Sequence, residues 1–211
     1  MFGRKKKKIS RNRSKATYVF GSIDDTNTGG RDQGKYQVLA GTVVDADKKD
    51  AFAAVSEKRN TGKKVKFVKR KRTREKALCE ISELNPRVYA VRYKKPELLP
   101  DKEEQNRIHV SQLSGVIHLI AKKEKAKNIE LYIERTRRIT DEDVKAIAEY
   151  VGRRYKKNIT AEFMEDPENC FALQSAEYAA GALNQAYNRR DKRYVEILGT
   201  KVVRGRRRNK P

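Results

Sequence analysis

The feature of this sequence that most constrains its fold is a repeated switch between two spacings of apolar residues. From Arg87 onward, short stretches with every second residue apolar alternate with longer stretches in which apolar residues recur every three or four positions. The first spacing predicts strands and the second predicts helices. It gives strands at 87–93, 128–134 and 159–163, and helices at 103–123, 140–151 and 169–187. This alternation is typical of parallel strands joined by helical crossovers.

Two more strands are predicted before this alternation, at 16–23 and 35–44. A glycine-rich turn separates them, so they are expected to form a hairpin with a long loop. Helical spacing also predicts short helices at 47–58 and 73–84, and 194–198 is expected to be a final short strand. The order predicts an α/β domain with a mixed five-stranded sheet and packed helices.

Charge divides the chain into three parts. The 211 residues include 51 Lys and Arg against 28 Asp and Glu, a formal charge of +23. Residues 1–15 and 200–211 are basic arms without an acid, and residues 16–199 form the folded domain. Phosphate is the commonest partner of such a surface, because each neutralised phosphate releases counterions. No apolar segment is long enough for a membrane, and none follows the basic N-terminus as in a signal peptide, so we expect a cytoplasmic protein without a membrane partner.

The residues expected to bind nucleic acid are the basic side chains of the arms and of the run 63–74. They are Arg4, Lys5, Lys6, Lys7, Lys8, Arg11, Arg13, Lys63, Lys64, Lys66, Lys69, Arg70, Lys71, Arg72, Arg204, Arg206, Arg207 and Arg208. Aromatic residues nearby would suit stacking on unpaired bases. The alternation of 87–93 places Val88, Ala90 and Arg92 on one face and Tyr89 and Val91 on the other, so some of these aromatics are expected in the core.

Acidic residues stand at the ends of predicted elements. Asp24 and Asp25 end the first strand, Glu134 ends the fourth, and Glu177 lies on the last helix. Carboxylates that converge from several elements can bind the divalent cations that phosphodiester cleavage uses. Acids at element ends are also common on any surface, so a solvated role for Glu134 and Glu177 stays open.

Four segments resemble an RNase H-like family known as domain of unknown function 3800. Its members have a first strand ending in Asp-Glu-Ser-Gly, a Leu-Ala-Gly second strand, an acid at the end of the fourth strand, and Leu-Gln-x-Ala-Asp-x-x-Ala-Gly in the last helix. This chain has Ile-Asp-Asp-Thr at 23–26, Val-Leu-Ala-Gly at 38–41, Leu-Tyr-Ile-Glu at 131–134 and Leu-Gln-Ser-Ala-Glu-Tyr-Ala-Ala-Gly at 173–181. The resemblance covers roughly residues 17–198.

The resemblance implies an RNase H-like sheet and a metal-dependent nuclease. Asp24, Glu134 and Glu177 would hold Mg²⁺, with Asp25 assisting. Glu134 and Glu177 depart from the family's Asp, and the extra methylene moves the oxygens by about 1 Å, a distance to which catalysis is sensitive. Lys-Val-Lys at 64–66 stands where the family has Glu-Leu-Lys.

Two functions are therefore open. The favoured one is RNA binding without catalysis or cofactor, as a structural component of a ribonucleoprotein such as the ribosome, with ribosomal RNA and other ribosomal proteins as partners. The two basic arms resemble those of ribosomal proteins, and the altered acids favour this interpretation. The alternative is a Mg²⁺-dependent nuclease of the RNase H-like superfamily. Neither function takes a small-molecule substrate.

Overall fold

The computed structural model describes residues 18–25, 35–48, 71–95, 101–136, 139–164, 171–199 and 202–205. Its strands are β1 (Tyr18–Asp25), β2 (Tyr36–Asp45), β3 (Arg87–Lys94), β4 (Asn128–Glu134), β5 (Asn158–Met164) and β6 (Val202–Gly205). Its helices are α2 (Lys71–Glu83), α3 (Lys102–Lys123), α4 (Asp141–Tyr155), α5 (Phe171–Asn188), α6 (Arg193–Leu198) and the 3₁₀ turn η1 (Ala46–Lys48). The N-terminal arm and most of the predicted 47–58 helix and of the 63–74 run lie outside the described residues.

The strands form one mixed sheet in the order β5-β4-β1-β2-β3-β6. β1 pairs antiparallel with β2, and β2 with β3, which confirms the predicted hairpin. β4 is parallel to both β1 and β5, as the predicted crossovers require. The α/β class and the mixed sheet are therefore confirmed.

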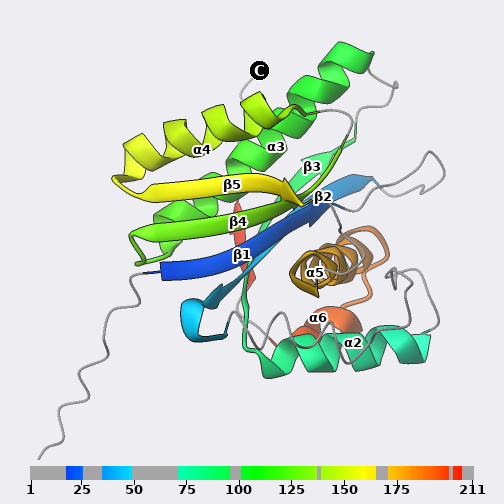
Figure 1. Ribbon diagram of the computed structural model, residues 1–211. Helices are drawn as coiled ribbons and strands as arrows, with labels where there is room; N and C mark the ends of the chain where they lie inside the picture. Colours follow the sequence, from blue (N-terminus) through cyan, green and yellow to red (C-terminus); the bar gives the residue numbers. More distant parts are fainter. Residues whose placement is uncertain are drawn as a thin grey trace, which may run out of the picture.

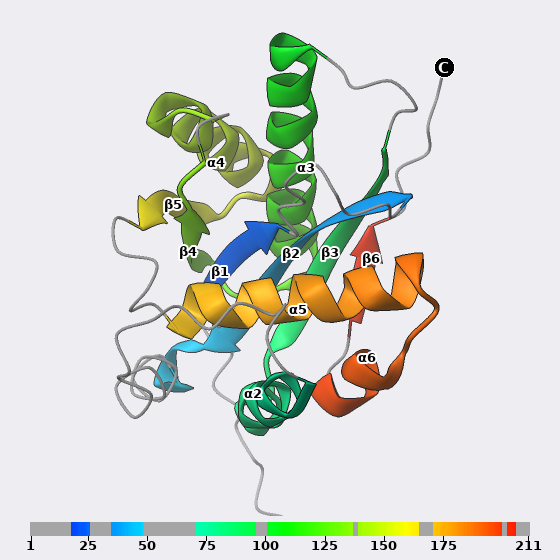
Figure 2. The same cartoon turned by 90° about the vertical axis from the view of Figure 1, so that its right-hand side faces the viewer.

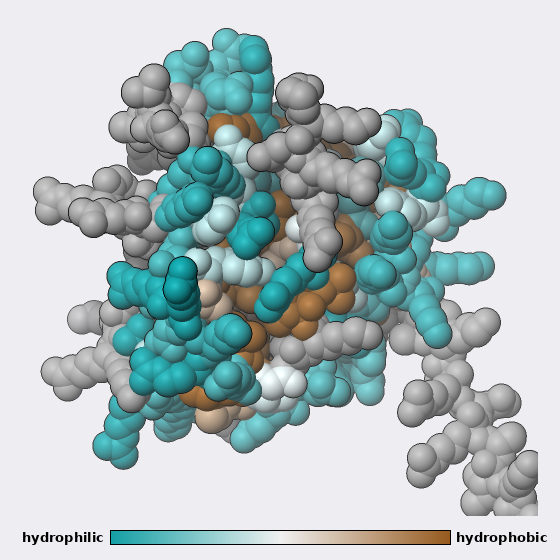
Figure 3. All heavy atoms as spheres, turned by 180° about the vertical axis from the view of Figure 1, so that it is seen from behind, coloured by the Kyte–Doolittle hydropathy of each residue, from teal (hydrophilic) through white to brown (hydrophobic). Residues whose placement is uncertain are grey.

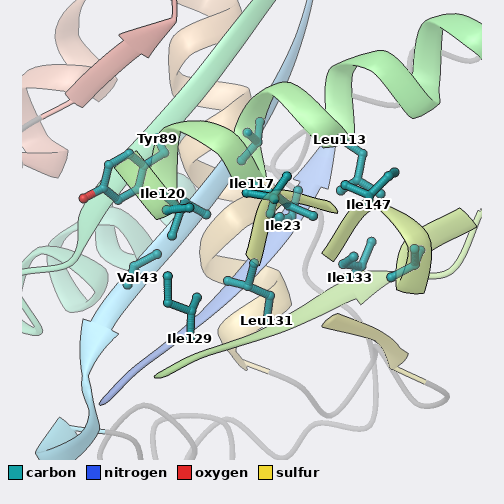
Figure 4. Close-up of a cluster of buried hydrophobic side chains, with 14 of the residues drawn as sticks. Ile23, Val43, Tyr89, Leu113, Ile117, Ile120, Ile129, Leu131, Ile133 and Ile147 are labelled. Carbon is teal, nitrogen blue, oxygen red and sulfur yellow. The ribbon is translucent and has the colours of Figure 1, made fainter. Parts of the chain in front are cut away.

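Helices cover both faces of the sheet (Figure 1). α3 and α4 pack on one face, and α5, α2 and α6 lie on the other. Each face has its own apolar core. On the α3 side, large aliphatic side chains of β1, β2, β4, α3 and α4 pack together, with Tyr89 of β3 beside Ile120 at one end of the cluster (Figure 4). The central strands thus lie between two layers of helices, whereas Asn158, Thr160 and Glu162 of the edge strand β5 are exposed.

Strand alternation decides which side chain enters which core. Val88 and Ala90 of β3 belong to the α5-side core, whereas Tyr89 and Val91 belong to the α3-side core. This confirms the predicted division of the strand and the burial of an aromatic residue, because Tyr89 is only 2% exposed.

The start of α4 follows the capping chemistry of its sequence. The Thr140 hydroxyl accepts a hydrogen bond from the backbone N–H of Asp143 at 3.1 Å, and the Asp143 carboxylate accepts from the backbone N–H of Thr140 at 3.0 Å. This reciprocal pair is a capping box, which fixes the first turn of a helix. The apolar face behind it, Val144, Ile147, Ala148 and Val151, is buried as predicted.

Two predictions near the C-terminus are wrong. Residues 194–198, expected to be a strand, form helix α6, in which Tyr194 and Leu198 bury the same face four residues apart. Gly199 ends this helix with a φ of 60°, and its N–H reaches the carbonyls of Val195 and Glu196. Glycine adopts this left-handed conformation without steric cost.

The sheet also extends into the segment assigned to the C-terminal arm. β6 pairs in parallel with β3, from Val88 opposite Val202 to Val91 opposite Gly205. The sheet therefore has six strands and not the five expected. A four-residue strand next to a basic tail carries too little periodicity to be recognised in sequence.

Hydrophilic side chains surround the apolar ones on the face seen from behind (Figure 3). Within the described segments, none of the helices combines the length and the apolar character that a membrane crossing requires.

Candidate acidic site at the carboxyl edge of the sheet

β1 and β4 bring two of the predicted acidic positions together. They run parallel, and their last paired residues are Ile23 and Ile133. Asp24 and Glu134 are the next residues on the two strands, and neighbouring strands lie about 4.8 Å apart. Asp24 also pairs in register with Ala40 of β2, which belongs to the α5-side core. The backbone thus places two acidic residues side by side at the edge of the sheet where β1 and β4 end, which we call the carboxyl edge.

Glu134 lies on the α5 side of the sheet. Ile129, Leu131 and Ile133 of β4 enter the α3-side core, so the alternate positions face α5, and Tyr132 packs against the core on that side. Arg135, one residue further, ion-pairs with Asp141 at 3.2 Å and stacks on Phe163 at 4.9 Å. Arg135 is therefore engaged on the α4 side of the sheet.

Glu177 lies on α5, the helix that crosses the strands on this face (Figure 2). The Ser175 hydroxyl donates to the carbonyl of Ala172 at 2.7 Å, so the Thr42 hydroxyl is the donor in its 2.6 Å bond to Ser175 Oγ. This fully buried contact fixes α5 to the middle of β2. Glu177 is partly buried, and its Oε2 is shielded from solvent.

A polar row along α5 indicates where Glu177 is directed. Asn184 and Asn188 follow Glu177 by seven and eleven residues, so the three share one side of the helix. Asn188 faces the first residue of β2: its Nδ2 donates to the carbonyl of Tyr36, and its Oδ1 accepts from the Tyr36 backbone N–H, both at 2.8 Å. β2 begins at the edge where β1 ends, because Asp25 pairs with Leu39. The side of α5 that carries Glu177 therefore faces that edge.

Neither asparagine was predicted from the sequence as part of a site. Their positions seven and eleven residues after Glu177, on the same side of the helix, are the signal that would have identified them.

The acids at the opposite edge of the sheet have a different environment. Arg87 donates to Glu124 at 2.6 Å and to Asp45 at 2.8 Å, and the Tyr89 hydroxyl donates to Glu124 at 2.5 Å. Burial lowers the pKa of Arg87, but its bonds to Glu124 and Asp45 raise that pKa above its ordinary value. Burial, followed by the bond to Glu124, raises the pKa of Tyr89. These carboxylates are neutralised by a fixed arginine and have a structural role.

The donor chemistry of the carboxyl edge fits a hard divalent cation, because carboxylate oxygens are the ligands that Mg²⁺ and Mn²⁺ prefer. Among the residues whose side chains are described, no three acidic, histidine or cysteine groups lie close enough to hold a metal ion. The side chains of Asp24 and Asp25 lie outside that set. The predicted ligand set Asp24, Glu134 and Glu177 thus stays a prediction.

Few of the residues predicted to bind nucleic acid are described. Lys71 and Arg72 begin α2, and Arg204 lies on β6, where its side chain is exposed. These three residues therefore lie on two separate elements, α2 and β6. The remaining residues of that set lie outside the described segments.

Comparisons with known proteins give structural similarities of low score. No family model matches this chain, and no curated protein matches it. A chain of the PCNA:RNase HII complex from Archaeoglobus fulgidus aligns with a TM-score of 0.48 and 13% identity, over 80% of this chain and 74% of that one. Ribonuclease H2 from Pyrococcus horikoshii OT3 gives a TM-score of 0.49 and 12% identity, over 80% and 73%. Bst-RNase HIII in complex with Mn²⁺ gives 0.45 and 14%, over 88% of this chain but 57% of that one. Function must therefore be inferred from the residues themselves.

Proposed function

We propose that this chain is an RNase H-like protein that binds nucleic acid and cleaves its phosphodiester backbone with the help of divalent metal ions. One observation carries this proposal. Asp24 and Glu134 occupy adjacent positions at the ends of neighbouring parallel strands, and Glu177 lies on the side of α5 that faces the same edge.

Asp24, Glu134 and Glu177 would hold the metal. A divalent cation at such a site supplies charge neutralisation at the phosphate and lowers the pKa of water. The chain's own contribution is positioning. The Thr42–Ser175 bond holds α5, and thereby Glu177, against the sheet. The formal charge of +23 attracts the polyanionic substrate to the domain.

This proposal reverses the preference drawn from the sequence alone. The excess of basic residues is compatible with either function, whereas a purely structural RNA-binding protein has no need for acids gathered at one sheet edge. The resemblance to domain of unknown function 3800 supports the same conclusion. Binding to ribosomal RNA or to ribosomal proteins stays a prediction that no described contact supports.

The test is cleavage of labelled single-stranded RNA, single-stranded DNA and an RNA–DNA hybrid, with Mg²⁺, Mn²⁺ or EDTA. We expect cleavage in metal only. Asp24→Asn should lower the rate by about 100-fold or more, since metal stabilisation of the transition state is worth several kcal/mol. Glu149→Gln is the matched control, because it makes the same change on the exposed outer side of α4.

Equal cleavage by Asp24→Asn and wild type, or no cleavage of any substrate, would refute the proposal. Glu177 offers a finer test. Glu177→Asp keeps a carboxylate and should retain part of the activity, whereas Glu177→Gln should abolish it. The non-catalytic alternative predicts instead that the protein co-sediments with ribosomes, that Asp24→Asn leaves this unchanged, and that deletion of residues 1–15 and 206–211 abolishes it.

A further inference from the structure

Five residues from four elements form a cluster of cations and aromatic rings, which we call the Arg–Tyr platform. It consists of Lys35 directly before β2, Tyr36 at the start of β2, Arg92 of β3, Tyr187 of α5 and Arg204 of β6. The Arg92 guanidinium lies 4.6 Å from the centroid of Tyr36 and 5.0 Å from that of Tyr187. Arg204 lies 5.6 Å from Tyr187, and the Lys35 ammonium lies 5.9 Å from Tyr36.

Contacts within the platform and with Asn188 fix the positions of its two tyrosine residues. The rings of Tyr36 and Tyr187 meet edge to face, with centroids 6.5 Å apart. Asn188 fixes the backbone of Tyr36 through two hydrogen bonds of 2.8 Å. Both rings are partly buried, whereas Lys35, Arg92 and Arg204 are exposed. A guanidinium stacked on a ring keeps its in-plane N–H donors available for a bidentate anion such as phosphate.

The three cations have no carboxylate partner among the described residues, since no ion pair there includes Lys35, Arg92 or Arg204. Arg87, in contrast, occurs on the same strand as Arg92 and binds two carboxylates at the other edge of the sheet. Exposed and positioned arginines without an internal acid are suited to an external anion.

The position of the platform relates it to the acidic site. Arg92 and Arg204 lie near the carboxyl ends of β3 and β6, and Tyr36 begins β2, so all three lie at the edge where β1 and β4 end. Tyr187 follows Glu177 by ten residues on α5, which is about 15 Å along a helix. A strand of nucleic acid bound at the acids would reach the platform within a few nucleotides.

We infer that the Arg–Tyr platform binds the phosphodiester backbone of a nucleic-acid strand that leaves the acidic edge alongside α5. The guanidinium groups cover the rings, so the platform contacts phosphates and does not read bases. The path of the strand rests on the proposed function, but the binding itself does not. Lys35, Tyr36 and Tyr187 were not predicted from the sequence to take part in binding.

The experiment measures binding in EDTA, where the proposed cleavage does not occur. Fluorescently labelled single-stranded RNA, single-stranded DNA and an RNA–DNA hybrid are titrated with wild type and with Arg92→Gln/Arg204→Gln. The control is Lys145→Gln/Arg153→Gln, which removes the same charge from exposed positions of α4. Thermal unfolding of each variant checks the fold, and Arg92→Lys/Arg204→Lys keeps the charge without the planar fork.

We expect the glutamine variant of the platform to weaken binding by tenfold or more, and the control by clearly less. The dependence of log K on log salt should become less steep by about 0.7 for each single-strand phosphate that the variant no longer neutralises, hence by about 1.4 for two phosphates. The lysine variant should keep most of the salt dependence and lose part of the affinity. Comparison of the three probes shows whether RNA or DNA supplies the phosphates.

Equal affinities and equal salt dependences of the platform variant and the control would overturn the inference. A second result would also overturn it: the lysine variant binds as weakly as the glutamine variant and unfolds well below the temperature of wild type. The platform residues would then affect binding only through the stability of the fold. The proposed function fails separately. Loss of binding in the platform variant, together with absence of metal-dependent cleavage by wild type, leaves the platform in place without the nuclease.

Discussion

The buried contact between Thr42 and Ser175 allows the attachment of α5 to be measured. Thr42→Val keeps the shape of the side chain and removes the 2.6 Å bond, which is worth about 1 kcal/mol net. Ser175→Ala should cost about 1–2 kcal/mol, because the Thr42 hydroxyl, which is 0% exposed, then loses this acceptor. Each single substitution already removes this hydrogen bond, so the double variant loses it only once. The free energy of unfolding should therefore fall by about 1 kcal/mol less than the sum of the single effects.

The assay is equilibrium unfolding in urea for wild type, both single variants and the double variant. In a domain of this size, each kcal/mol also lowers the melting temperature by about 2–4 °C. Thr160→Val is the control, since Thr160 is exposed on β5 and its replacement should change stability by less than about 0.5 kcal/mol. Additive effects of Thr42→Val and Ser175→Ala, within about 0.3 kcal/mol, would show that this bond does not hold α5 to the sheet.

Three further perturbations are expected to have distinct results. Glu124→Gln should lower the unfolding free energy by about 2 kcal/mol. This is less than the loss of a partner costs in a fully buried ion pair, because the side chain of Arg87 is 31% exposed. A urea midpoint equal to that of wild type would contradict this prediction. Gly21→Ala should cost about 1–3 kcal/mol, since its Cβ would lie 2.6 Å from a backbone oxygen of β2. Gly115→Ala on α3 should cost clearly less by the same assay, because its Cβ would meet only the Val91 side chain, at 3.2 Å, and alanine favours the helix. The hydrogen bond from Arg193 lowers the pKa of Asp191 from 3.8 to about 2, so its stabilising contribution is present above about pH 4 and lost as the pH falls through 2. Asp191→Asn should lack the part of the fall in unfolding free energy at acid pH that comes from Asp191. An NMR titration that gives Asp191 a pKa near 4 would contradict this prediction.

The elements that were predicted correctly have strong local signals. α4 combines a capping box with an apolar face at helical spacing, and β4 alternates strictly between Asn128 and Glu134. α6 was misassigned because Tyr194–Leu198 is short and apolar, and its helical state depends on burial against α2 and α5. β6 depends on pairing with β3, more than a hundred residues earlier in the chain. Pairing of this kind leaves no periodic trace in a segment of four residues.

The same distinction applies to the candidate site. The adjacency of Asp24 and Glu134 could be expected, because crossovers bring the ends of parallel strands to one edge. The Arg–Tyr platform could not, since its residues come from β2, β3, α5 and β6, which are far apart in the sequence and meet only in the folded chain. Arg204 was predicted to bind nucleic acid as part of a basic arm, and the structure places it on a strand against Tyr187.

In the proposed nuclease, the negative charge at the carboxyl edge would favour metal binding and oppose the binding of nucleic acid. Acidic residues at Asp24, Glu134 and Glu177 repel a phosphate when no cation is present, and like charges a few ångströms apart cost on the order of 1–4 kcal/mol near a protein surface. In the proposed function, the platform and the other basic residues offset this repulsion. Asp24→Asn should therefore bind nucleic acid in EDTA at least as tightly as wild type while it loses cleavage in metal. A structural acid with no bound phosphate nearby would show neither change, so this pair of opposite effects distinguishes a metal site from a solvated surface.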